Sequence, residues 1–169
     1  DDTESTHEGD PDKAFAAADM ILETDYYAPF LAHAPMEPLN ATLHITENGA
    51  ELWTGVQFVG AAQGVLERLT GLPRGDIKIH NQFLGGGFGR RATLSHIVEV
   101  AEIAMSIDKP VQLLWSREDD LRHGFYRPAA MMKIKATTDE EGRVTAWQAR
   151  RSGANITAQT MKNALPGVL

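Results

Sequence analysis

Four glycines lie close together near the middle of the chain, at positions 85, 86, 87 and 89, and Arg90 and Arg91 follow them. Because glycine has no Cβ atom, the backbone N–H groups of such a loop can approach a ligand closely. Alternating apolar residues predict a strand before the loop and a helical pattern resumes after it, so a helix N-terminus would add partial positive charge to that of the arginines. This chemistry suits a ligand that is anionic or carries oxo groups.

The loop lacks the two familiar patterns for binding nucleotides. The dinucleotide pattern Gly-x-Gly-x-x-Gly would require glycine at position 90, and the Gly-Lys-Ser/Thr ending of a P-loop is missing too. Taken alone, the loop leaves three interpretations open. It is a tight, closely packed turn; or it binds a free phosphate or nucleotide, as a stand-alone anion-binding module; or it belongs to a scaffold that binds only a partner protein.

Helices and strands alternate along the chain, and these elements must position the loop. Asn48-Gly49 lies between two alternating runs and is a strong hairpin signal, while Gly71 and Pro73 end a helical pattern. Residues 111–115 are apolar and predict a buried strand, whereas the polar residues 117–122 predict no element. The full prediction is helices at about 10–20, 59–69 and 92–107, and strands at about 21–28, 42–46, 51–54, 76–83, 111–115, 130–138 and 143–150.

This order predicts an α+β fold, a two-layer α/β sandwich in which helices cover one face of a mixed β-sheet. Residues 1–9 are polar and acidic and predict a flexible tail. Residues 10–169 are predicted to form one domain, with two small lobes as the alternative. The chain starts without Met and stops without a visibly completed element. We therefore expect it to be a fragment of a larger subunit.

Composition argues against several kinds of function. The formal net charge of −7 argues against a nucleic-acid partner, since proteins of that kind carry basic patches. The apolar stretches are only a few residues long, far short of the ~20 that span a bilayer, so no membrane span is expected. There is no cysteine, which excludes a thiolate zinc site and a cysteine-ligated iron–sulfur cluster within these residues. Scattered histidines without ligand spacing lead us to expect no metal bound by protein side chains.

Several segments, in order between about residues 32 and 136, resemble one family. The segments are residues 33–38, 54–57, 69–73, 85–91 and 110–120. They are similar to the molybdopterin-binding large subunits of the xanthine dehydrogenase and aldehyde oxidase superfamily, most closely the isoquinoline 1-oxidoreductase β-subunit branch. The resemblance implies a fold like that of a molybdenum-cofactor-binding domain.

The resemblance also implies a reaction and its partners. In this family a molybdenum centre on a pterin, in some members a cytosine dinucleotide, hydroxylates an aldehyde or an electron-poor N-heterocycle such as isoquinoline. The oxygen comes from water and the electrons pass to [2Fe–2S] clusters. Because the chain has no cysteine, those clusters would lie on a separate subunit or segment, and the resemblance implies a partner, a small iron–sulfur subunit. The other implied partners are the remainder of the large subunit and the small substrate.

Individual residues match the family's site. Gln57 matches the glutamine that hydrogen-bonds an oxygen ligand of molybdenum, although a polar residue at a strand end is the alternative. Arg127 falls near the position of a substrate-orienting arginine, where a surface ion pair is at least as good an interpretation. The residues implied to bind the cofactor are Gln57, Gly86, Gly87, Phe88, Gly89 and Arg90, with Phe88 as an apolar wall or a core residue.

The residue implied to act as general base is missing from this chain. In the family it is a glutamate within a glycine-rich motif nearer the C-terminus of the subunit, and no such motif occurs here. Glu37 lies between Pro35 and Pro38, where a conformational role is the better interpretation. We therefore assign no catalytic residue and expect the isolated chain to be inactive. Ala92 stands where several members carry a substrate-binding glutamate, so the resemblance does not extend to purine-like substrates.

Overall fold

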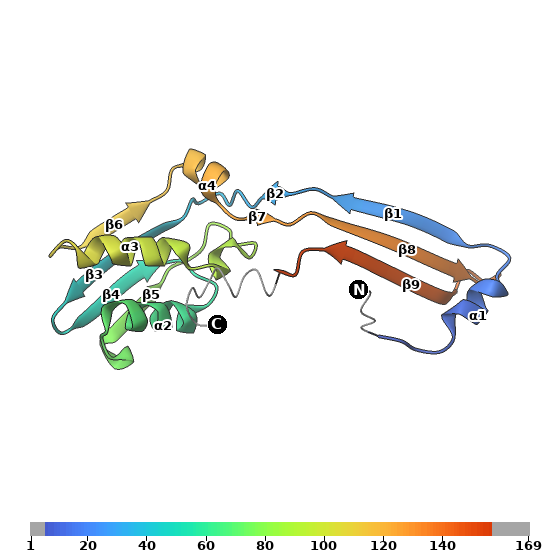
Figure 1. Cartoon of the computed structure of the whole chain (residues 1–169), viewed down its shortest axis with the longest axis horizontal. Helices are drawn as coiled ribbons and strands as arrows, with labels where there is room; N and C mark the ends of the chain where they lie inside the picture. Colours follow the sequence, from blue (N-terminus) through green and yellow to red (C-terminus); the bar gives the residue numbers. More distant parts are fainter. Residues whose placement is uncertain (1–5, 157–169) are drawn as a thin grey trace. The chain divides into compact units, whose positions relative to one another are not determined.

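The computed structural model describes residues 6–156, which divide into two compact units (Figure 1). The first unit combines the chain up to Phe30 with Pro128–Ala154, and the second is built from Leu31–Arg127. The predicted tail, residues 1–9, lies partly outside the described residues, and those of its residues that are described form no helix or strand. The units are treated separately below.

The second unit contains a four-stranded mixed sheet. Two of its strands, β4 and β5, are parallel neighbours, and the other pairs are antiparallel. β3 and β4 form the predicted hairpin around Asn48. Across the sheet the strands are β5 (Ile77–Asn81), β4 (Gly49–Thr54), β3 (Asn40–Thr46) and β6 (Val111–Leu114).

Two helices, α2 (Val59–Thr70) and α3 (Ser95–Met105), cover one face of this sheet (Figure 1). Side chains alternate along a strand, so every second residue points toward the helices. These inward residues are almost all apolar and, with the apolar stripes of the helices, form one core of Ala41, Leu43, Ala50, Leu52, Val56, Ala62, Val65, Leu66, Ile77, Leu94, Ile97, Val100, Ala101 and Ala104. Among the described helices, none has the length and apolar character that crossing a bilayer requires.

Short elements complete the second unit. β2 (Leu31–Ala32) pairs with β7 (Tyr126–Arg127), and single 3-10 turns form η1 (Arg74–Asp76) and η2 (Arg90–Ala92). α4 (Arg117–His123) starts at a reciprocal cap, in which Ser116 and Asp119 each bond the other's backbone N–H. Its acidic first turn and basic last turn also complement the helix dipole.

The first unit is a three-stranded antiparallel sheet with one short helix. α1 (Pro11–Ala16) begins after Asp10, whose carboxylate accepts a hydrogen bond from the Lys13 N–H. Phe15 is the buried residue of α1, and the ammonium of Lys135 lies 4.6 Å from the centre of its ring. Across the sheet the strands are β1 (Leu22–Ala28), β8 (Ala130–Thr138) and β9 (Val144–Gly153).

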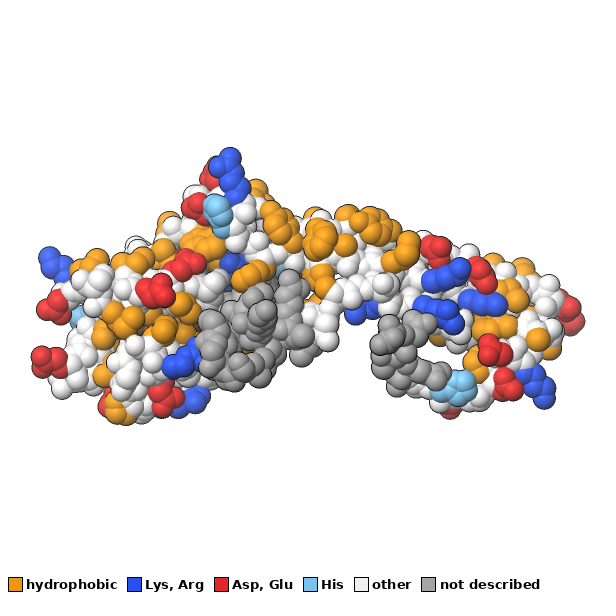
Figure 2. Space-filling model, viewed as in Figure 1, with side chains coloured by type: hydrophobic (Ala, Val, Ile, Leu, Met, Phe, Trp, Pro, Cys, Tyr) orange, Lys and Arg blue, Asp and Glu red, His pale blue; other side chains and the backbone are white. Residues whose placement is uncertain are grey.

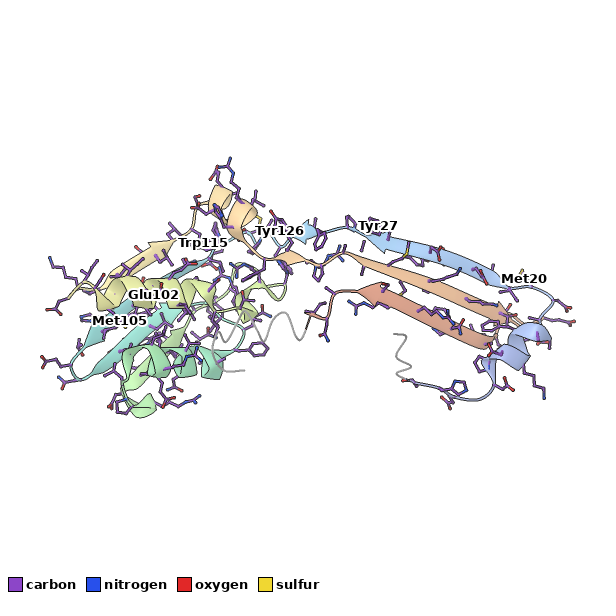
Figure 3. All side chains as sticks on the ribbon, viewed as in Figure 1. Met20, Tyr27, Glu102, Met105, Trp115 and Tyr126 are labelled. Atoms are coloured by element: carbon purple, nitrogen blue, oxygen red, sulfur yellow. The ribbon has the colours of Figure 1, made fainter. Side chains whose placement is uncertain are left out.

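The two faces of this three-stranded sheet differ in chemistry. One face carries Glu23, whose carboxylate lies 3.6 Å from the Lys135 ammonium and 3.9 Å from that of Lys133. Figure 2 shows charged side chains gathered over these strands, and Tyr27, labelled in Figure 3, is a further exposed residue of β1. The opposite face, here called the open apolar face, is left exposed or half-exposed by the described residues. Its large apolar side chains are Leu22, Tyr26, Met132, Ile134 and Trp147, and it also carries Arg151 next to Met132.

The structure confirms a mixed α/β composition and corrects the predicted single sheet. Most elements lie within a few residues of their predicted positions, but the hairpin of β8 and β9 pairs with β1 in a sheet of its own. An alternating strand pattern specifies which side chains share a face. It does not specify which strand lies alongside, because that depends on contacts between residues far apart in sequence.

Three local predictions were wrong. β6 is an edge strand with Leu114 68% exposed, so it is not the buried strand that its apolar run predicted. The helix after the glycine loop starts at Ser95, because η2 occupies the first residues that the apolar pattern had assigned to it. Residues 117–122, predicted to form no element, lie in α4, which its caps and charges define without an apolar stripe.

Candidate cofactor site

Two parallel strands bring Gln57 and the glycine loop together. Gln57 follows β4 and the loop follows β5, and the carboxyl ends of neighbouring parallel strands meet at one edge of a sheet. The N–H of Gly89 donates a hydrogen bond of 3.1 Å to Oε1 of Gln57. A Cβ atom on Gly87 would lie 2.9 Å from the same oxygen, so this close approach requires glycine. The predicted convergence of Gln57 and the loop is therefore present.

The hydrogen bond to Gly89 fixes the orientation of the Gln57 amide. Since Oε1 accepts from a backbone donor, the Nε2 group must point elsewhere, because two donors would otherwise face each other. Within residues 6–156, no partner of Nε2 is present, and the Gln57 side chain is exposed. Gln57 thus offers two N–H donors without adding charge.

The backbone N–H groups of the loop divide into used and unused donors. The N–H of Gly85 donates to Oε2 of Glu37 at 2.8 Å, and that of Gly89 donates to Gln57. Across the described chain, the N–H groups of Gly86, Gly87 and Phe88 have no partner. We call these three N–H groups and the Nε2 group of Gln57 the cradle. These donors are unpaired and belong to one loop and the side chain bonded to it, and unpaired N–H groups of this kind suit acceptor oxygens.

The loop also holds Phe88, which with Ala34 is one of the two described residues other than glycine that have positive φ. Phe88 (φ 51°) and Gly89 (φ 87°) are the central residues of a turn that the Arg90 N–H closes on the Gly87 carbonyl at 2.8 Å. A positive φ costs a residue with a side chain about 1–2 kcal/mol. Packing in the core does not offset this cost for Phe88, because its side chain is 73% exposed. The interpretation of Phe88 as a core residue is therefore wrong. Strain that is held without a packing reason is a feature of functional sites.

Glu37 supports the loop from the other side. Its N–H donates to the Gly85 carbonyl at 3.1 Å while its carboxylate accepts from the Gly85 N–H and from Nδ2 of Asn40. Partial burial raises the pKa of Glu37, but the hydrogen bonds from Gly85 and Asn40 and the charge of Arg91 outweigh it, so the pKa lies below its ordinary value of 4.5. A carboxylate that is ionised and bonded on both oxygens has a structural role, as the sequence suggested, and is a poor general base.

The two arginines that follow the loop are buried and do not add charge to its exposed side. Arg91 is 0% exposed and bonds to Glu37 and to backbone carbonyls. Arg90 is 2% exposed, and its guanidinium lies 5.4 Å from the ring centre of Trp115 (labelled in Figure 3) and 5.1 Å from that of Phe125. The helix dipole predicted behind the loop is displaced too, since α3 begins only at Ser95. The donors of this site are neutral N–H groups.

Arg127, the predicted substrate-binding residue, lies in β7 opposite Leu31 and is exposed. It belongs to the same compact unit as the glycine loop but to a different sheet edge. The structure therefore brings Gln57, Gly86, Gly87, Phe88 and Gly89 into one cluster, which the buried Arg90 follows in sequence. Arg127 lies in the separate two-stranded sheet of β2 and β7.

The fold and the site define a class of protein. Unpaired backbone donors and a neutral amide lie at the carboxyl edge of a mixed sheet, and donors of this kind suit a ligand with acceptor oxygens. Comparison with known families identifies the particular family. The family described as the molybdopterin cofactor-binding domain matches residues 1–162, and the chain belongs to this family.

Known proteins agree with this assignment. Isoquinoline 1-oxidoreductase subunit beta of Brevundimonas diminuta is 34% identical over 132 residues, which are 77% of this chain and 17% of that protein. The aldehyde oxidoreductase molybdenum-binding subunit PaoC of Escherichia coli (strain K12) is 27% identical over 166 residues, which are 97% of this chain and 22% of that protein. The resemblance stated from the sequence is confirmed.

Solved structures share the fold. The aldehyde oxidoreductase from Desulfovibrio gigas matches with a TM-score of 0.70 and 23% identity, over 85% of this chain and 16% of that chain. At this identity the likeness shows the fold alone. The chain spans about a fifth of the length of the relatives that it matches.

Proposed function

We propose that this chain is part of the large subunit of a molybdenum hydroxylase and forms one wall of the molybdopterin site. Membership of the molybdopterin cofactor-binding family supports the cofactor. The observation that carries the proposal is the cradle, in which three loop N–H groups and the Gln57 amide lie together without partners among the described residues. Oxygen ligands of a metal are acceptors, so they match donors of this kind.

The residues present fit such a group in shape as well as in chemistry. A Cβ atom on Gly85 would lie 2.4 Å from Cβ of Glu37, and one on Gly87 would meet Gln57, so side chains at these positions would displace the cradle. The charge of Arg91 is balanced by Glu37 at 2.9 Å, which leaves the cradle a neutral set of dipoles. When bound, the molybdenum cofactor would supply the redox centre that hydroxylates a substrate carbon with oxygen from water.

Each residue of this chain then has a defined task. The Nε2 group of Gln57 and the N–H groups of Gly86, Gly87 and Phe88 would hold and orient ligand oxygens. Gly89 would act by fixing the Gln57 amide, and Arg90, predicted to bind the cofactor, would contribute only through its backbone N–H, which closes the turn on the Gly87 carbonyl. The exposed ring of Phe88 would exclude water as an apolar wall.

The remaining walls and the remaining chemistry would come from elsewhere. Met36, which precedes Glu37, and Phe58, which follows Gln57, are 90% and 58% exposed. Their exposure favours a covering by other parts of the large subunit. We propose that those parts carry the general base and that the isolated chain is therefore inactive. We propose that the [2Fe–2S] clusters lie on a small partner subunit, since these residues contain no cysteine to ligate them.

We propose a small aldehyde or N-heterocycle as substrate, in line with the names of the relatives. Arg127 remains the candidate for orienting it, and a pterin in the cytosine dinucleotide form remains the expectation for the cofactor. A stand-alone anion-binding module is the competing function. Titration calorimetry of the 169-residue chain with pyrophosphate and nucleotides separates the two, because a single wall of a larger site predicts negligible affinity.

The direct test is Gln57→Ala in the full-length subunit, with oxidation of aldehydes and N-heterocycles as the assay. Loss of one preorganised donor to a reacting centre typically lowers kcat about a hundredfold, and we expect a loss of that order. Gln82→Ala is the matched control, since Gln82 is an exposed glutamine at the same sheet edge. Among the described residues, its side chain bonds only the His80 carbonyl. Equal activity of the Gln57→Ala and Gln82→Ala variants would contradict the proposal.

A further inference from the structure

One buried side chain, Arg91, joins the separate chain segments that form the cradle. Its Nε donates to the Gly86 carbonyl at 3.2 Å, and its Nη1 donates to the Gly55 carbonyl at 3.0 Å. Its Nη2 donates to the carbonyls of Glu37 and Pro38 at 3.0 and 3.2 Å. Three segments that are distant in sequence are thus bonded to one planar group.

The backbone of Arg91 adds a fourth connection. The N–H of Gln57 donates to the Arg91 carbonyl at 3.1 Å, two residues beyond Gly55. Gln57 therefore has its main chain bonded to Arg91 and its side chain bonded to Gly89, while Gly86 is bonded to Arg91 directly. Both parts of the cradle, Gln57 and the glycine loop, are therefore hydrogen-bonded to Arg91.

Glu37 completes this arrangement. Its Oε2 lies 2.9 Å from Nη2 of Arg91 and accepts the Gly85 N–H at 2.8 Å, so the carboxylate links the arginine to the start of the glycine loop. Arg91 is fully buried, and a buried guanidinium without its counter-ion would carry a large desolvation penalty. The pair therefore holds its geometry only when both partners are present.

We propose that Arg91, acting with Glu37, is the positioning residue of the cofactor cradle, which sets the spacing between the Gln57 amide and the N–H groups of Gly86, Gly87 and Phe88. The inference rests on the proposed function and adds to it a residue that does not touch the cofactor. Lysine cannot replace Arg91, because an ammonium is a single point donor and lacks the planar fork that reaches several carbonyls in different directions. Residues that orient the groups holding a metal typically change its binding or its activity about 10- to 100-fold when mutated.

Arg90 provides a matched comparison within the same chain. It is the neighbouring residue, it is as deeply buried as Arg91, and it packs between two aromatic rings. Its side-chain hydrogen bonds, however, go to Thr93 and Ser95 rather than to any segment of the cradle. Loss of buried packing and charge is thus common to changes at both arginines, while loss of cradle geometry is expected for Arg91 alone.

The experiment compares Arg91→Lys with Arg90→Lys in the cofactor-loaded full-length subunit. Three quantities are measured: melting temperature, molybdenum content per subunit, and turnover per bound molybdenum. We expect both variants to melt at lower temperature than the wild type. Turnover per bound molybdenum, assayed well below both melting temperatures, should fall about tenfold or more in Arg91→Lys and clearly less in Arg90→Lys. A purely structural role for Arg91 would lower stability or metal content and leave turnover per bound molybdenum unchanged.

The possible outcomes separate this inference from the proposed function. If the wild type holds molybdenum and both variants turn over alike per bound metal, the positioning role of Arg91 is contradicted while the proposed function stands. If the wild-type subunit holds no molybdenum, the proposed function fails and the inference fails with it. If Arg91→Lys does not fold, Glu37→Gln takes its place, since it keeps the side-chain shape and removes the charge. A reduced turnover per molybdenum in Glu37→Gln supports the inference, and an unchanged one overturns it.

Discussion

The two units of this chain use a β-sheet in different ways. The four-stranded sheet buries one face under two helices, and its inward side chains, such as Leu43, are completely inaccessible. The three-stranded sheet has α1 as its only described helix, and its open apolar face leaves Leu22 57% exposed. All cradle residues lie in loops of the unit that contains the four-stranded sheet, directly after β4 and β5. Donors that must be held at fixed spacing lie on the rigid, well-packed unit, while the other unit has apolar surface available for contact with further polypeptide.

The same contrast appears in the ion pairs of the two units. Glu37 pairs with an arginine that has no solvent exposure, and both partners make further hydrogen bonds. Glu23 pairs with Lys133 and Lys135, and all three side chains are in contact with solvent. A pair that is held on several sides can position a backbone, whereas an exposed pair adds little beyond a weak attraction.

The largest expected effect comes from truncating matched leucines in the two sheets. Leu43→Ala should lower the free energy of unfolding by about 2–5 kcal/mol, because it empties a fully buried position, while Leu22→Ala should change it by only about 0.5 kcal/mol. Native-state hydrogen exchange of the 169-residue chain, followed strand by strand, measures both. Similar losses for the two variants would mean that the two sheets are packed alike.

An intermediate effect is expected from acid. His96 is buried in α3, and burial, followed by the charges of Arg90 and Arg91, lowers its pKa to about 3. The unfolded chain therefore binds a proton near pH 6.5 that the folded chain does not, so stability falls as the pH drops from about 6.5 toward 3. Between pH 7 and pH 5 this amounts to about 2 kcal/mol.

The variant His96→Leu isolates this contribution. Leucine is close to histidine in size and cannot titrate. Between pH 7 and pH 5, the free energy of unfolding of the four-stranded unit should therefore fall by about 2 kcal/mol less in the variant than in the wild type. Hydrogen exchange of β3 and β4 at the two pH values measures the difference, with β8 and β9 as the internal reference. The idea is refuted if the variant and the wild type show the same pH dependence in β3 and β4.

The smallest expected effect is the loss of the exposed ion pair in the three-stranded sheet. Glu23→Gln should change the free energy of unfolding by about 0.5 kcal/mol or less, and 1 M salt should remove most of that difference. Urea unfolding at low and high salt measures it. A loss above about 2 kcal/mol that persists in salt would show that this pair is held as firmly as Glu37 and Arg91.

Much of the fold and of the candidate site could be predicted from the sequence. Alternation and turn residues located most elements, and the adjacency of Gln57 to the glycine loop follows from two parallel strands that end at one edge. The resemblance to a family identified Gln57, which no local pattern distinguishes from any polar residue after a strand. The convergence was thus predictable once both segments had been recognised.

The rest depended on contacts between distant residues. Glu37 and Gly85 bond each other across 48 positions, and Arg91 reaches Glu37 across 54, and neither pairing leaves a periodic signal. Arginines near a glycine loop suggest free positive charge, because arginine is rarely buried, yet here Arg91 and Arg90 are inside the unit. The assignment of strands to two sheets escaped prediction for the same reason, since pairing partners are selected by tertiary packing.

The central claim is that the cradle receives oxygen atoms bound to a metal. A crystal structure of the full-length subunit with its cofactor bound tests this most directly, through the distances from Nε2 of Gln57 and from the N atoms of Gly86, Gly87 and Phe88 to the nearest metal-bound oxygen. We predict that Nε2 and at least one of the loop N atoms lie within about 3.2 Å of such an oxygen. A structure in which all four donors bond only protein or solvent, with the metal bound elsewhere, would contradict the account.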